Sequence, residues 1–420
     1  MTTSSSHQHY KAATPLVFLL FVLVNAIIFI AAPEEQKVCD QSVIQHSTSE
    51  ARQEGKWTWW ITRNYLMRVK SPDIALMGSS QMGAAVFSAD AKTLNSTLDC
   101  VTHRKGSTLE KAIEKRSAEN VDVFNFAMGG SMVSDSYMLS KGLFHNGSKP
   151  RLIVLGVAPR DFMDNTLTSP SATEPFAFFS PYVPLGELKD CAFSDFFGRL
   201  SWAIDHELPI KRLGGAFNDY VAACCPVKAG KDVLALAPPH KVQNQPLQGI
   251  LTTDEVRPGE WLIPPQVAGW PFMDNTKEYL RRYHTAKPPI YQQEMAFFTA
   301  FLRDAAEERI PVLVVGMPSL TMNRTLLPEA FWAEFRGTMA TLCRENKAKW
   351  VDISANPDFG RRDYLDTVHL NAAGGEKLFD KIAAAILDDP RLSAVITGTG
   401  AGRNAFAEKV GDSATNGTWQ

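Results

Sequence analysis

Three residues that could together perform acyl-transfer chemistry stand far apart in this sequence. Ser80 closes the segment Gly78-Ser79-Ser80, directly after an apolar run, and Asp366 and His369 form a DxxH motif near the other end of the chain. A serine hydroxyl becomes a nucleophile when a histidine takes its proton, and that histidine needs a carboxylate to fix its tautomer. These residue types predict a Ser–His–Asp triad.

Each motif alone also has an ordinary structural explanation. Gly-Ser-Ser after a strand is usually a turn that leads into a helix N-cap. An isolated DxxH can be a capped turn that carries a surface histidine. The triad interpretation makes a geometric prediction: the Ser80 and His369 side chains lie near hydrogen-bonding reach, and Asp366 faces the other imidazole nitrogen.

Five short apolar runs predict the strands that would bring these residues together. Each run is rich in Val, Ile or Leu, as are strands that are buried on both faces of a sheet. The runs are Asp73–Met77, Val121–Phe126, Arg151–Val157, Pro311–Gly316 and Lys349–Ile353. Helical spacing of apolar residues follows at 290–309 and 328–347, and Asn371 stands at an N-cap position before a further helix.

Strands that alternate with helices indicate an α/β fold of the doubly wound, three-layer type with a five-stranded parallel sheet. In such folds ligands bind beyond the carboxyl ends of the strands. Ser80 follows the first predicted strand, and the DxxH motif follows the last one. The fold class therefore places both motifs at one edge of the sheet.

A hydrophobic segment precedes this domain. The run 15–32 is apolar apart from Asn25, and we assign residues 14–32 to a transmembrane anchor because the run is longer than a signal-peptide core. A cleaved signal remains the alternative. Lys11 before the run and Glu34 after it predict that residues 1–13 form a cytoplasmic tail and that the following chain lies outside the cytoplasm.

The rest of the chain divides into four predicted parts. Residues 34–70 form a juxtamembrane segment whose tryptophans (Trp57, Trp59 and Trp60) either sit at the membrane interface or pack onto the domain. The α/β domain covers 71–390. A proline-rich insertion at about 163–289 is either a lid or substrate platform or a purely structural excursion. Residues 394–420 form a flexible tail.

The composition argues against several other functions. The 420 residues carry a net charge of −2 without a basic block, so no nucleic-acid partner is expected. The six cysteines form neither a CxxC motif nor a Cys/His cluster, which argues against a zinc site, and their disulfide pairing is open. The sequence has no P-loop and no GxGxxG after a strand, so we expect no cofactor.

The two motifs together resemble the SGNH/GDSL hydrolase superfamily over roughly residues 73–388, apart from the insertion. Gly78-Ser79-Ser80 matches the family's first block, usually Gly-Asp-Ser, with Ser80 in the nucleophile's place. The second block, an Asn before a glycine-containing turn, is similar to Asn125–Ser131. The fifth block is intact as Asp366 and His369. The resemblance implies an oxyanion hole that includes Ser80 and Gly130, with Gly129 as a weaker candidate than Gly130.

The third block departs from the family pattern. Where the family has Gly-x-Asn-Asp, this chain reads Gly156-Val157-Ala158-Pro159-Arg160-Asp161, so the oxyanion-binding Asn is missing. Loss of one such donor costs about 3–4 kcal/mol of transition-state stabilisation. Arg160 is the candidate replacement; pairing with Asp161 and binding of an anionic substrate group are its alternative roles.

The resemblance implies a serine O-acyl esterase or O-acyltransferase at the cell membrane, with its catalytic domain periplasmic or extracellular. Relatives with the same Gly-Ser-Ser variant modify cell-wall polymers and secreted polysaccharides. The expected substrate is therefore an acylated glycan, such as an O-acetylated exopolysaccharide. A multipass membrane O-acyltransferase is the expected partner. Two alternatives stay open: a lipase or thioesterase, and a non-catalytic accessory protein, which the missing Asn favours.

Overall fold

A computed structural model of the chain describes most of the sequence downstream of residue 53. The described ranges are 54–145, 148–193, 196–207, 255–265, 272–283 and 288–398, with a few isolated residues before 54. The predicted tail 1–13, most of the predicted anchor, residues 208–254 of the insertion and residues 399–420 lie outside them. None of the helices described is both long enough and apolar enough to cross a bilayer.

The five predicted strands form one parallel sheet, which confirms the α/β fold class. In sheet order they are β4 (Val123–Asn125), β2 (Ile74–Met77), β5 (Leu152–Val157), β8 (Val312–Gly316) and β9 (Lys349–Asp352). Every neighbouring pair is parallel. The strand order reverses direction at β2 and β5, because β4 lies on one side of β2 and the later strands lie on the other. A ligand site is expected at the carboxyl ends of these two strands.

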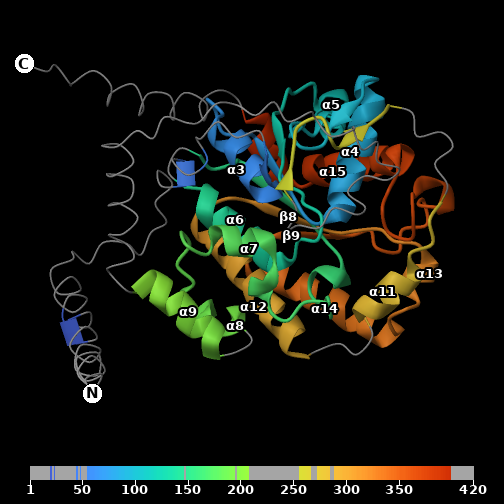
Figure 1. The fold of residues 1–420 in the computed structure, drawn as a ribbon. Coiled ribbons are helices and arrows are strands. Elements are labelled where there is room, and N and C mark those ends of the chain that lie inside the picture. The colour runs from blue at the N-terminus through green and yellow to red at the C-terminus, as the bar shows by residue number, and fades with distance from the viewer. Residues whose placement is uncertain are drawn as a thin grey trace, which may run out of the picture.

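Helices cover both faces of the sheet, and alternate strand residues enter two separate hydrophobic clusters (Figure 1). On β2, Ile74 and Leu76 face one cluster, and Ala75 and Met77 face the other. The first face carries α4 (Ser80–Leu94), α5 (Ser107–Ser117), α15 (Ala372–Asp388) and α16 (Pro390–Thr397). The second carries α3 (Trp57–Leu66), α6 (Val133–Leu143), α7 (Glu174–Phe179), α12 (Pro288–Glu307) and α14 (Glu329–Glu345).

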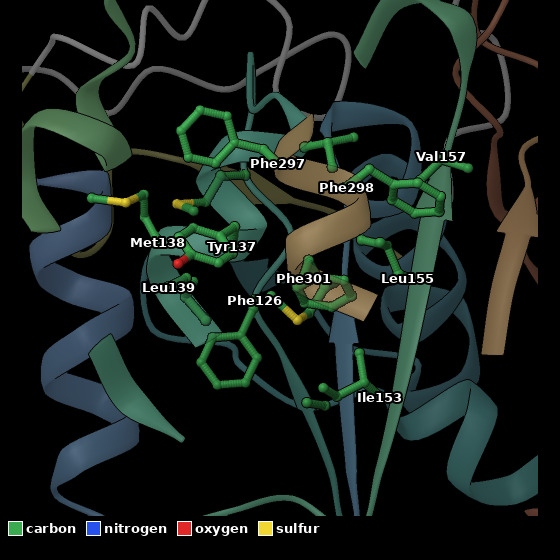
Figure 2. Close-up of a cluster of buried hydrophobic side chains, with 14 of the residues drawn as sticks. Phe126, Tyr137, Met138, Leu139, Ile153, Leu155, Val157, Phe297, Phe298 and Phe301 are labelled. Atoms are coloured by element: carbon green, nitrogen blue, oxygen red, sulfur yellow. The ribbon is translucent and has the colours of Figure 1, made fainter. Parts of the chain in front are cut away.

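The second face is rich in aromatic side chains. Figure 2 shows Phe297, Phe298 and Phe301 of α12 lying between the strands and α6. Phe298 contacts Phe162 edge-on at a centroid distance of 5.5 Å. Both helices predicted from apolar spacing are present here, as α12 and α14. The Asn371 side chain caps α15, as predicted, by accepting hydrogen bonds from the N–H groups of Ala373 and Gly374.

Parts of the insertion return to the body of the domain. Two short antiparallel ribbons join it to earlier residues: β1 (Gly55–Lys56) pairs with β6 (Glu255–Val256), and β3 (Leu98–Asp99) pairs with β7 (Leu262–Ile263). The other helices described are α8 (Lys189–Ala192), α9 (Phe196–Glu207), α11 (Thr276–Tyr283) and α13 (Thr321–Arg324), with one-turn 3-10 helices at Pro159–Asp161, Pro170–Ala172, Gly186–Leu188 and Arg361–Asp363.

Two predicted domain boundaries need correction. Trp57, Trp59 and Trp60 are buried in the second hydrophobic cluster, and the Trp60 indole donates to the Val256 carbonyl. Helix α3 therefore belongs to the folded domain, which begins before residue 71, and packing onto the domain is the correct interpretation of these tryptophans. At the other end, α16 continues to Thr397 and buries Ile396, so the domain ends later than residue 390.

Candidate active site

Ser80 lies at the first position of α4, immediately beyond the carboxyl end of β2. Gly78 makes the turn between strand and helix with φ +147°, a value that side chains disfavour. A Cβ at this position would lie 2.9 Å from the Gly156 carbonyl oxygen on the neighbouring strand β5. Only glycine fits here, and the tight turn directs Ser80 to the sheet edge. The Ser80 N–H is also in the first helical turn, where N–H groups have no partner within the helix.

The structure brings Ser80 and His369 together, as the sequence predicts. His369 Nε2 lies 2.8 Å from Ser80 Oγ, and His369 Nδ1 lies 2.6 Å from Asp366 Oδ2. Ser80 is half-buried and the His369 side chain is 12% exposed, so both remain within reach of a substrate. The geometric prediction is confirmed; the catalytic role of the three residues remains a prediction.

Asp366 is fully buried and oriented by the backbone of its own loop. Its Oδ1 accepts hydrogen bonds from the N–H groups of Val368 at 2.9 Å and His369 at 2.8 Å, which leaves Oδ2 for the imidazole. Burial raises the pKa of this carboxyl, but the charge of His369 and these hydrogen bonds outweigh burial and hold the pKa below its usual value. Asp366 is therefore the ionised partner that the His369 tautomer requires.

The glycine-containing turn predicted for the oxyanion lies beside Ser80. Strand β4 ends at Asn125. The Met128 N–H donates to the Gly78 carbonyl at 3.1 Å, which places the turn next to the Gly78–Ser80 segment. Gly130 adopts φ +79°, a left-handed conformation that favours glycine. The turn leads directly into α6. At the start of this helix the Met132 N–H donates to the Asp135 carboxylate, and the Ser134 N–H donates to the Glu294 carboxylate.

Arg160, the candidate replacement for the missing Asn, is engaged by the backbone of the glycine-containing turn and by acidic side chains. It is 6% exposed, and its Nη1 donates to the Ser131 carbonyl at 2.6 Å while its Nη2 donates to the Gly130 carbonyl at 2.9 Å. Nε and Nη2 also bind Asp164 Oδ2. The alternative partner, Asp161, lies 3.6 Å away. The Arg160 donors are thus directed to the turn and to these acids, and a direct role of Arg160 in the oxyanion hole stays a prediction.

Ser79 and Asp161, the sequence neighbours of Ser80 and Arg160, are joined by a side-chain hydrogen bond. Both residues are buried, and a side-chain hydrogen bond from Ser79 lowers the pKa of Asp161. Burial is the larger effect and raises this pKa to about 6, against the opposing charge of Arg160. The Ser79 side chain thus binds Asp161, whereas the Ser80 side chain contacts His369.

Several residues around the site carry no sequence signal. Asn275, from the insertion, accepts hydrogen bonds from the backbone N–H and the hydroxyl of Thr367, which lies between Asp366 and His369. Tyr279 is 4% exposed; burial raises its pKa, and the charge of Asp366 raises it further. Asp164 and Arg282 form an ion pair beside Arg160. These contacts join segments that are distant in sequence, so neither composition nor spacing reveals them.

The described residues contain no group of three or more His, Cys, Asp or Glu side chains that could hold a metal ion. Of the cysteines in the described ranges, Cys100, Cys191 and Cys343 are free. A scan against protein-family models finds no match to this sequence, and a search of curated proteins finds none either.

Proposed function

We propose that this chain is a serine O-acyl esterase or O-acyltransferase of the SGNH/GDSL type that acts on an acylated glycan. One observation carries the proposal: Ser80 Oγ lies 2.8 Å from His369 Nε2, while Asp366 binds the opposite imidazole nitrogen at 2.6 Å. The residues meet at the carboxyl edge of the sheet, beside the strand-order reversal where doubly wound folds bind ligands.

The proposed reaction proceeds in two steps. Ser80 Oγ attacks the acyl carbonyl carbon while its proton passes to His369 Nε2, and Asp366 stabilises the resulting imidazolium. His369 then returns that proton to the departing sugar oxygen, which leaves an acyl group on Ser80. In the second step water or a glycan hydroxyl attacks this ester, with His369 again as the base. Water as the attacking group gives hydrolysis, and a glycan hydroxyl gives transfer.

The oxyanion of the tetrahedral intermediate would be bound by the backbone N–H groups of Ser80 and Gly130. The Ser80 group belongs to the first turn of α4, where the helix dipole also favours negative charge. Arg160 would stabilise the conformation of this turn, because it donates hydrogen bonds to the carbonyls of Gly130 and Ser131. With the family's Asn absent, the hole has one donor fewer, and we expect slower turnover than that of a three-donor enzyme.

The apolar run 15–32 supports a membrane location, with the catalytic domain outside the cytoplasm and a multipass O-acyltransferase as partner. A reporter fused after residue 420 should then be active only outside the cytoplasm. The full-length chain should also stay with membranes after a high-salt wash. Release of a soluble form with a new N-terminus near Pro33 would instead identify the run as a cleaved signal.

The catalytic proposal is tested with the full-length chain purified in detergent. The protein should hydrolyse p-nitrophenyl acetate and react covalently with a fluorophosphonate, and Ser80→Ala should abolish both activities. Ser88→Ala is the matched control, because Ser88 is a buried serine on the same helix, two turns further along. Labelling that persists in Ser80→Ala would assign the reactive serine elsewhere.

The second candidate function is a non-catalytic accessory protein of a glycan-acylation complex. The absent third-block Asn and the commitment of Arg160 to backbone carbonyls favour it. If the wild-type protein neither cleaves esters nor labels, while Ser80→Ala still supports glycan modification in cells, the accessory function stands and the enzyme proposal fails.

A further inference from the structure

One short segment of the insertion is linked to both halves of the candidate site, directly to one half and through two intervening side chains to the other. This segment, Phe272–Tyr283, comprises helix α11 and the four residues before it. The site itself has two halves: the acid–base loop with Asp366 and His369, and the oxyanion turn at Gly130. Helix α11 lies beside α13 at the outer part of the domain (Figure 1).

The beginning of the segment holds the acid–base loop. Asn275 Oδ1 accepts hydrogen bonds from the Thr367 N–H at 3.1 Å and from the Thr367 hydroxyl. Two residues earlier, the Met273 N–H donates to the Leu365 carbonyl at 3.0 Å. These bonds fix the backbone at Leu365 and Thr367, on both sides of Asp366. The loop fixed in this way carries His369, which contacts Ser80.

The end of the segment holds the oxyanion turn through a relay of charges. Arg282 Nη1 binds Asp164 Oδ2, the same carboxylate oxygen that accepts from Arg160 Nη2 at 2.9 Å. Arg160 in turn donates to the carbonyls of Gly130 and Ser131. Asp164 is fully buried, and the two arginines outweigh its burial and lower its pKa, so it stays ionised between them.

The middle of the segment packs inward between these two attachments. Tyr279 and Tyr283 are buried, with ring centroids 5.7 Å apart, whereas Leu280 is 49% exposed. The helix therefore buries the tyrosine-bearing face and leaves other positions exposed. The two polar attachments of the segment are contacts by which the insertion can orient catalytic groups.

We propose that Asn275 and Arg282 are positioning residues. Through them the segment Phe272–Tyr283 holds the acid–base loop and the oxyanion turn at the positions relative to Ser80 that catalysis requires. The proposal rests on the proposed function, and it gives the insertion a role in catalysis rather than that of a structural excursion. Neither residue touches the reacting atoms. Each acts through another group: Asn275 through Thr367, and Arg282 through Asp164 and Arg160.

Steady-state kinetics on p-nitrophenyl acetate with the full-length protein test this role. Asn275→Ala and Arg282→Ala should each lower kcat roughly 10- to 100-fold with KM changed less than about twofold, because small misplacements of catalytic groups slow the chemical step. Asn275→Asp keeps the acceptor oxygen and Arg282→Lys keeps the positive charge, so both should recover most of the lost kcat. Arg257 is elsewhere in the insertion and forms a surface ion pair with Glu54. Arg257→Ala removes this ion pair and should leave kcat unchanged.

Hydrogen exchange supplies a readout that does not depend on activity. Asn275→Ala should speed amide exchange in residues 362–371 and Arg282→Ala in residues 126–135, each with little effect on the other segment. If both variants keep kcat, or if both loosen the whole domain alike, the positioning role is refuted while the enzyme proposal survives. If the wild-type protein shows no esterase activity or labelling, the enzyme proposal fails, and the exchange pattern alone decides whether α11 holds the two segments.

Discussion

The described part of the chain holds two histidine–aspartate pairs of similar distance and burial, and each is in contact with helix α4. His369 Nδ1 lies 2.6 Å from Asp366, and His103 Nε2 lies 2.8 Å from Asp90. Both carboxylates are fully buried, and the histidine side chains are 12% and 13% exposed. Distance and burial do not distinguish the two pairs.

The pairs differ in what else each residue contacts. His369 presents its second ring nitrogen to Ser80 Oγ at the carboxyl edge of the sheet. Asp90 accepts from the N–H groups of Ser107 and Thr108 at the start of α5, so its pair belongs to a helix cap. In the part of the chain described, His103 makes no hydrogen bond to a serine hydroxyl. Asp90 also lies ten residues beyond Ser80 on α4, which is about 15 Å along the helix.

The comparison shows that a histidine–carboxylate pair becomes a candidate catalytic site through its third partner and its place in the fold. An oriented imidazole needs a nucleophile on its far nitrogen and an open sheet edge beside it. Asp366 and His369 meet both conditions. Asp90 accepts from backbone N–H groups instead and binds His103, and we expect this pair to contribute to stability alone.

The largest expected difference follows from removing each histidine. His369→Ala should lower kcat by a factor on the order of 10⁶, because Ser80 loses its base. The double variant Ser80→Ala/His369→Ala should be little slower, since triad members act as a unit. His103→Ala should change kcat less than about twofold, and should lower the free energy of unfolding by about 1.5–3 kcal/mol through loss of a charge-assisted hydrogen bond. Esterase kinetics and urea unfolding measure both quantities.

Equal losses of kcat in the two histidine variants would break the comparison, because they would show that both act through the fold. A His369→Ala protein that unfolds at the same urea concentration as the wild type would sharpen it.

The next largest effect concerns the carboxylates. In Asp366→Asn an amide NH₂ would replace Oδ2, donate to His369 Nδ1 and leave Nε2 protonated, so it could not accept the Ser80 proton. We expect a fall in kcat of about 10⁴. Asp90→Asn would turn an amide donor toward the Ser107 N–H and should lower the free energy of unfolding by about 2–3 kcal/mol with kcat intact.

A kcat in Asp366→Asn within tenfold of the wild type would contradict the triad, whatever its stability. Measuring single-turnover acylation as well as kcat would show which step depends on the carboxylate.

Another buried acid, Glu174 at the start of α7, extends the comparison to a carboxyl with few partners. One oxygen accepts from the Thr58 hydroxyl, and the other has no hydrogen-bond partner among the residues that the structure describes. Burial raises the pKa of Glu174 from 4.5 to about 7. The folded state therefore binds this proton more tightly than the unfolded state, and the stability that it provides is complete below about pH 4.5 and lost as pH rises through 7.

Glu174→Gln removes this dependence. Relative to wild type, the variant should gain up to about 3 kcal/mol in free energy of unfolding at pH 8 and almost nothing at pH 4.5. Urea unfolding at both pH values measures the difference. A gain of equal size at the two pH values would contradict the ionisation argument and point to packing instead.

Much of this structure was predictable from local patterns. The strands were predictable because both faces of the sheet are buried, which makes each strand a short unbroken apolar run such as Leu152–Val157. The candidate triad was predictable because its acid and base occur within four residues and its nucleophile follows a strand. The positions of Ser80 and His369 then follow from the parallel sheet, since strand ends meet at one edge.

The rest depends on contacts that leave no local pattern. The burial of Trp57 requires knowledge that α3 packs against the sheet, and a tryptophan near an apolar segment is equally typical of a membrane interface. Arg160 has the chemistry of an oxyanion donor, and only the positions of Asp164 and the Gly130 carbonyl show where its guanidinium points. Asn275 and Thr367 are separated by 92 positions in the sequence, so their bond cannot be inferred from spacing.

The smallest expected effect concerns Asn371, the residue next to the acid–base loop that, like Asp90, caps a helix. Its Oδ1 accepts from the N–H groups of Ala373 at 3.0 Å and Gly374 at 3.1 Å. Asn371→Ala leaves these two groups to water and should lower the free energy of unfolding by about 1 kcal/mol, the usual value of an N-cap. Because Asp366 is held by its own loop backbone and by no contact with Asn371, kcat should change less than about threefold. A loss of kcat beyond tenfold at unchanged stability would show that the α15 cap, rather than the loop itself, sets the position of His369.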